Sequence, residues 1–184
     1  MKTIKEYIIN NGINESQLST DDAMNLLLGL PLTDKFSVNI NVDGYNLDGD
    51  YNDLCVQRSI GKIIEAVIFT QLEHYYNNLN QNKYEFKTLK NNKEEQATGI
   101  NKSCDFYLKD RTTGEYVNIE IKAYKKESNP TLASTQGEAD YILGIKYDIS
   151  KNVVSIKDVV LFSLKDKTKK RFSKEDTKDG FRLK

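Results

Sequence analysis

Several residue types are scarce in this 184-residue chain, and each scarcity excludes a class of protein. There are only two cysteines, two prolines and one histidine, and tryptophan is absent. Two cysteines are too few for a disulfide scaffold or a cysteine-based zinc site, so Cys55 and Cys104 are predicted to pack as small apolar groups. The single histidine, His74, excludes a metal cluster built on several histidines.

Long apolar runs are missing as well. No stretch approaches the roughly 18 consecutive apolar residues that a membrane span requires. Residues 1–6 carry an acid, and no apolar segment of the signal-peptide kind follows them. Hydrophobic residues make up 38% and charged residues 29%, an ordinary composition for a globular protein. We therefore expect a soluble, cytoplasmic protein without a membrane partner.

An excess of charge of one sign is also lacking, because 27 basic and 27 acidic side chains give a formal net charge of zero. A protein that holds nucleic acid by bulk charge alone is therefore not expected. The distribution is uneven, since residues 1–60 contain four basic and nine acidic side chains and the rest of the chain carries the basic surplus. The densest basic stretch, 165–171, has two interpretations. It contacts phosphates, or it is a solvated surface, which is the commoner role of a lysine-rich terminal segment.

The length suits one compact domain, with a small N-terminal appendage. Residues 1–34 are predicted to form two short helices. Thr3 and Glu6 have capping-box spacing and mark the start of the first helix, and Gly29 ends the second. This segment is expected to be a lid, a dimer contact or a DNA contact. Residues 35–184 are expected to form the core domain.

The core domain mixes helical and strand periodicities, which indicates an α/β fold. Ile60, Ile64 and Ile68 recur on one face of a long helix, and Glu65 lies at the border of that face, from which a carboxylate can reach past the core. The elements predicted along this domain are a strand at 36–42, a helix at 53–79, strands at 103–109 and 115–123, a short helix at 132–139, and strands at 141–147 and 153–162.

The strand at 115–123 carries the residues most suited to chemistry. Ile119 and Ile121 alternate with Glu120 and Lys122, so a carboxylate and an ammonium share the face opposite the apolar one. If the two strands pair as a hairpin, Asp105 approaches Glu120. Two neighbouring carboxylates repel each other and favour a cation between them.

Oxygen ligands of this kind select hard divalent cations, and magnesium retains waters and substrate phosphate oxygens. Asp105 and Glu120 are therefore predicted to hold Mg²⁺, with Mn²⁺ as a substitute. Lys122 is predicted to orient or deprotonate the attacking water, or to neutralise developing charge, and Glu65 to assist through a water or a second ion. An acid two residues before a lysine is also common as a surface ion pair. The prediction of a metal site therefore depends on Asp105 and Glu65 as well as on Glu120 and Lys122.

These residues resemble the motif of the PD-(D/E)XK nuclease superfamily, in which an acid precedes a Glu or Asp that stands two residues before a Lys on the next strand. Asp105 and Glu120-Ile121-Lys122 match that motif, and Glu65 matches a helix glutamate often found upstream. Cys104 stands where the nominal proline would be. The resemblance implies a three-layer αβα restriction-endonuclease-like fold, with a central mixed sheet flanked by helices, and a metal ligand in the backbone carbonyl of Ile121.

Gln136 lies where some members of that superfamily carry a glutamine that contacts the site or DNA. Recombination-type members place a tyrosine four residues later, where this chain has Asp140 followed by Tyr141. The chain therefore looks more like a type II restriction endonuclease, which implies a homodimer that cuts double-stranded DNA at a specific site and a cognate DNA methyltransferase. The alternatives are a structure-specific or repair and recombination nuclease of the same superfamily, and a non-catalytic DNA-binding module.

Overall fold

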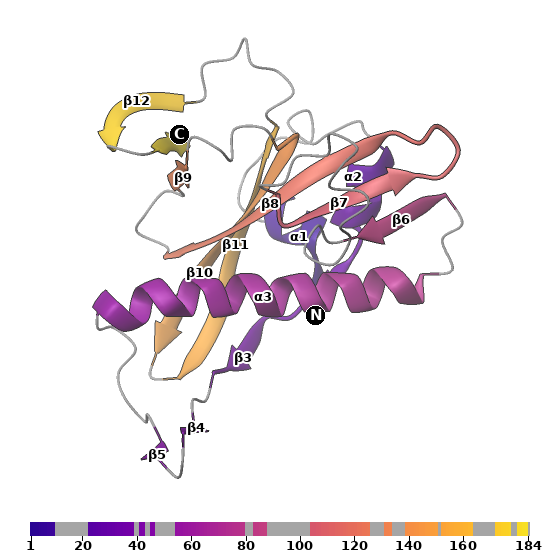
Figure 1. The fold of residues 1–184 in the computed structure, drawn as a ribbon. Coiled ribbons are helices and arrows are strands. Elements are labelled where there is room, and N and C mark those ends of the chain that lie inside the picture. The colour runs from indigo at the N-terminus through magenta and orange to yellow at the C-terminus, as the bar shows by residue number, and fades with distance from the viewer. Residues whose placement is uncertain are drawn as a thin grey trace.

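A computed structural model gives the fold of the chain (Figure 1). The residues that it describes are 1–9, 22–38, 41–42, 45–46, 54–79, 83–87, 104–125, 131–133, 139–150, 152–163, 172–177 and 180–183.

A mixed sheet organises the described residues. Its six strands have the order β3-β11-β10-β8-β7-β6. Strands β8 and β10 pair in parallel, and the other neighbours pair antiparallel. The bounds are β3 Lys35–Ser37, β6 Tyr84–Lys87, β7 Phe106–Asp110, β8 Tyr116–Lys125, β10 Tyr141–Ser150 and β11 Val153–Ser163. The predicted hairpin at 103–123 and the two strands after it are thereby confirmed.

Helices flank this sheet. The long helix α3, Leu54–Asn78, has nearly the predicted bounds and runs along the sheet (Figure 1). Helix α1, Ile4–Ile9, starts with the expected capping box: Thr3 N donates to Glu6 Oε2 at 2.6 Å, and Glu6 N donates to Thr3 Oγ1 at 3.3 Å. Helix α2, Asp22–Leu28, ends before Gly29 as predicted. The expected class, α/β with a central mixed sheet and flanking helices, is confirmed.

One face of the sheet and all three of these helices share a single apolar core. Ile60 and Ile64 of α3 are fully buried there, together with Ile119 of β8 and Leu143 of β10. Burying a side chain of this size contributes about 1.5–3 kcal/mol. Because side chains alternate along a strand, packing Ile119 in this core places Glu120 on the opposite face of β8.

Smaller sheets complete the described structure. Their strands are β1 Lys2–Thr3 with β2 Pro31–Leu32, β4 Asn41–Val42 with β5 Tyr45–Asn46, and β12 Phe172–Thr177, β13 Gly180–Leu183 and β9 Thr131–Ala133 in the order β12-β13-β9. No helix in the described ranges is both long enough and apolar enough to cross a membrane.

Two predicted elements need correction. The helix expected at 132–139 is wrong at its start, because Thr131–Ala133 forms strand β9 and pairs with β13. That pairing partner lies far away in sequence, and such pairing overrides local propensity. The strand expected at 36–42 is divided into β3, which ends at Ser37, and β4, which starts at Asn41. The division of the chain at residue 34 stays a prediction.

Candidate active site

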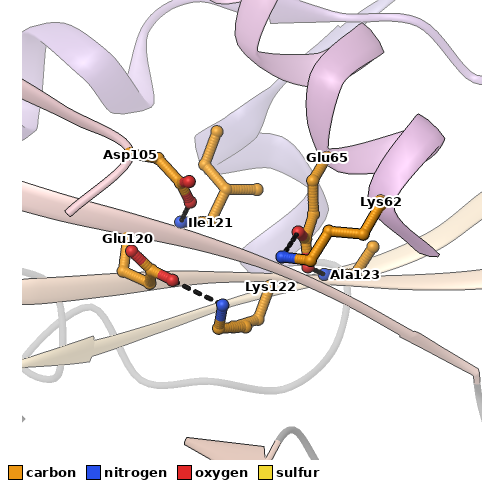
Figure 2. A network of polar contacts seen from close by, with 7 residues as sticks. All are labelled: Lys62, Glu65, Asp105, Glu120, Ile121, Lys122 and Ala123. Carbon is orange, nitrogen blue, oxygen red and sulfur yellow. Dashed lines mark hydrogen bonds and ion pairs between the residues drawn. The ribbon is translucent and has the colours of Figure 1, made fainter. Parts of the chain in front are cut away.

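The candidate site lies where two neighbouring strands part. Strand β7 pairs with β8 only as far as Phe106 opposite Ile119, so the rest of β8 continues without β7 beside it. Two carboxylates accept the backbone N–H groups of this edge. Asp105 Oδ2 accepts from Ile121 N at 2.8 Å, and Glu65 Oε1 accepts from Ala123 N at 3.1 Å (Figure 2).

These two carboxylates come from different parts of the chain. Asp105 immediately precedes β7 and is 16 residues from its partner, whereas Glu65 comes from α3 and is 58 residues from its partner. Strand edges expose backbone groups that need hydrogen-bond partners, and here the side chains supply them. The hydrogen bonds therefore fix both acids beside the strand that carries Glu120 and Lys122.

Glu120 and Lys122 form an ion pair on the face of β8 opposite the core. Only 2% of Glu120 and 8% of Lys122 is exposed. Lys122 Nζ donates to Glu120 Oε1 (Figure 2). Two buried charges are rare in a small domain, because removing each from water costs several kcal/mol that mutual attraction only partly repays. This pair therefore has an unusual position for a purely structural contact.

The carboxylates of the site influence one another. Burial raises the pKa of Glu120, and the negative charge of Asp105 raises it further, while the hydrogen bond and charge of Lys122 act in the opposite direction. The charge of Glu65 adds a smaller upward effect. Glu120 thus lies within electrostatic reach of two further carboxylates, which is an environment that attracts cations.

Lys62 is the site residue that the sequence reasoning missed. Its position on the helical wheel directs it away from the apolar face, yet its ammonium turns back and donates to Glu65 Oε2 at 2.6 Å (Figure 2). Burial lowers the pKa of Lys62, but the hydrogen bond and charge of Glu65, with Asp105 and Glu120, outweigh that effect and raise it. The i,i+3 spacing of Lys62 and Glu65 was the available signal.

The donor set suits a hard divalent cation in its chemistry. Asp105, Glu120 and Glu65 offer carboxylate oxygens, and the backbone carbonyl of Ile121 lies between Glu120 and Lys122 in the chain. Within the described part of the chain, no three acidic, histidine or cysteine side chains are already gathered as a metal-binding group. Metal binding would thus require these carboxylates to move closer together.

Comparison with known proteins finds similarity to a solved structure but not to a protein-family model. No protein-family model matches the sequence, and neither does any curated protein. The solved structure of the NlaIV restriction endonuclease is similar over 100% of this chain and 68% of its own, with a TM-score of 0.49 and 14% identity. A similarity at that level carries no argument about activity.

The structure brings together most of the residues that the sequence singled out. Asp105, Glu120, Lys122 and Glu65 lie around the same segment of β8, next to Ile121. Gln136 lies outside the described residues. Cys104, which occupies the nominal proline position, is buried, as expected for a small apolar group.

Proposed function

We propose that this protein is a magnesium-dependent endonuclease that hydrolyses phosphodiester bonds in double-stranded DNA. The observation that carries the proposal is that the carboxylates of Asp105 and Glu65 accept N–H groups of the same strand segment that carries Glu120 and the buried Lys122. A phosphodiester is anionic and resists attack, so its hydrolysis needs a centre that gathers positive charge around it and activates a water.

In this proposal Asp105, Glu120 and the carbonyl of Ile121 hold Mg²⁺ or Mn²⁺, with Glu65 in support. When bound, the ion polarises the phosphate and lowers the pKa of a coordinated water. The side chains of the chain do the positioning. Hydrogen bonds from the edge of β8 hold the carboxylates of Asp105 and Glu65, which limits the geometry in which both can be used.

Lys122 has the role of the cation next to the reacting phosphate. Its side chain is 10% exposed, and its hydrogen bond to Glu120 fixes the direction of its ammonium. From this position Lys122 donates a hydrogen bond to the attacking water or to a phosphate oxygen as negative charge develops. In a largely water-free setting such a hydrogen bond is stronger than in bulk solvent.

The finer proposal is a type II restriction endonuclease. An enzyme of this kind acts as a homodimer at a symmetric site, because twofold symmetry in the protein matches twofold symmetry in the DNA. It is accompanied by a DNA methyltransferase of the same specificity. Gln136, which follows the site in sequence, is proposed to contact the site or the DNA.

A cleavage assay on long linear DNA of known sequence tests the proposal. With Mg²⁺ the protein should produce fixed fragments, and chelation should stop cutting. Asp105→Asn and Glu120→Gln should each reduce the rate by at least about 100-fold. Asp148→Asn, which changes an exposed acid on β10, is the matched control and should cut normally.

The same assay separates the alternatives. Preference for branched or flapped DNA over linear duplex would favour a structure-specific or repair nuclease. Binding to DNA without cutting, and without dependence on a metal, would favour a non-catalytic module. If wild-type protein neither cuts nor binds any DNA tested, the proposed function is wrong.

A further inference from the structure

Lys62 carries a charge that the proposed reaction has not yet used. Its side chain is 71% exposed, yet it donates to the 11% exposed carboxylate of Glu65. Exposed ion pairs at i,i+3 spacing are common on helices, but this one includes an acid that also accepts the edge N–H of Ala123. The ammonium of Lys62 therefore lies beside the carboxylates of the candidate site, on an exposed side chain.

The charges of the site do not balance in the free protein. Glu65, Asp105 and Glu120 contribute three negative charges, and Lys62 and Lys122 contribute two positive ones. A bound divalent cation would convert this excess of one negative charge into an excess of one positive charge, which matches the single negative charge of a phosphodiester. That balance holds only if Lys62 stays in the site.

Metal binding would displace the ammonium of Lys62 from Glu65. A divalent cation bound to Glu65 would compete for the same oxygens and would repel the ammonium. Lys62 is exposed and has a flexible four-carbon stem, so leaving Glu65 does not require the helix to move. The released ammonium of Lys62 can then pair with a phosphate of the substrate.

Building on the proposed nuclease function, we propose that Lys62 is a phosphate-contacting residue. In the free protein the ammonium of Lys62 pairs with Glu65. When a divalent cation binds Glu65, the ammonium pairs with a DNA phosphate instead. Lys122, buried on Glu120, keeps its place during this exchange. The two lysines thus have different tasks, one fixed beside the reacting phosphate and the other mobile between a carboxylate and the substrate backbone.

Two binding measurements test this, and neither needs cleavage. The variant is Lys62→Gln, and the matched control is Lys83→Gln, which breaks an exposed ion pair with Asp22 that includes no residue of the candidate site. Calorimetry with Mg²⁺ or Mn²⁺ alone should show that Lys62→Gln binds the metal about 3- to 10-fold more tightly, because a competing cation is gone. The control should bind metal as the wild type does.

Fluorescence anisotropy with a mixed-sequence duplex, in Ca²⁺ to prevent cutting, supplies the second measurement. A plot of log affinity against log salt concentration has a negative slope, and each lost phosphate contact makes that slope shallower by about 0.9. Lys62→Gln should show this change, and Lys83→Gln should not. An unchanged slope in Lys62→Gln overturns the proposal, and so does unchanged metal affinity. If wild-type protein fails to bind the duplex at all, the proposed function itself fails, which is a distinguishable result.

Discussion

The buried pair Glu120–Lys122 gives a prediction that separates a functional ion pair from a structural one. Lys122→Met removes the ammonium but retains much of the side-chain volume. Glu120, which is only 2% exposed, then loses its cation beside Asp105 and Glu65. Breaking a buried pair on one side typically costs about 3–5 kcal/mol of unfolding free energy, because the remaining charge is uncompensated.

The double variant Glu120→Gln with Lys122→Met should be far less destabilised. It removes both charges, and replacing a buried ion pair with neutral groups of similar volume is often neutral or stabilising. We expect it to lie within about 1 kcal/mol of the wild type. The double variant should therefore lose less unfolding free energy than Lys122→Met alone.

Urea unfolding followed by circular dichroism measures this difference. With a slope of about 2 kcal/mol per molar urea, Lys122→Met should shift the midpoint downward by about 2 M, and the double variant should restore most of it. Mg²⁺ should partly rescue Lys122→Met, since it supplies the lost positive charge, and should have little effect on the double variant. A double variant as unstable as Lys122→Met would refute the reasoning, because the pair would then be a structural requirement.

Three further changes give separate expectations. Tyr76→Phe should stabilise the fold by about 1 kcal/mol, because the hydroxyl is buried without a hydrogen-bond partner among the described residues. Burial raises the pKa of Tyr76 from 10.0 to about 12, so stability should fall between these pH values in the wild type and less so in the variant, as alkaline unfolding curves will show. Glu65→Gln should weaken Mg²⁺ binding in calorimetry by about 10-fold while leaving the melting temperature nearly unchanged, since an amide oxygen still accepts from Ala123 N. Gly61→Ala should raise the melting temperature by improving helix propensity, because its new Cβ would lie 3.7 Å from Ala123 O, an ordinary contact.

The elements that the sequence predicts well are those whose pattern is long or locally closed. Helix α3 extends over seven turns of one amphipathic pattern, so its bounds differ from the prediction by one residue at each end. The hairpin of β7 and β8 turns at Gly114, whose φ of 75° suits glycine. Strand β9 was predicted as helix because its pairing with β13 is set by a segment almost 50 residues away, and no local pattern reveals such a partner.

The candidate site was predictable for a similar reason. Glu120 and Lys122 are two residues apart on one strand, so the strand period alone places them on the same face. Asp105 follows from the register of the neighbouring strand. Lys62 was missed because a long flexible side chain can turn away from the direction of its Cβ, and only the position of Glu65 in the folded protein determines where its ammonium goes.

The parting of β7 and β8 also explains why the acids and the lysine meet at this place. An exposed strand edge attracts another strand unless its N–H groups are satisfied in some other way, and a carboxylate satisfies one N–H while keeping a second oxygen. Asp105 and Glu65 do this on alternate residues of β8, on either side of Lys122 in the chain. The same feature that protects the edge therefore concentrates negative charge beside a buried ammonium. Replacing Asp105 with a residue that cannot accept from Ile121 N should loosen the edge as well as remove a proposed metal ligand. Asp105→Ala should therefore be less stable than Asp105→Asn, and hydrogen exchange at Ile121 N should be faster in the alanine variant.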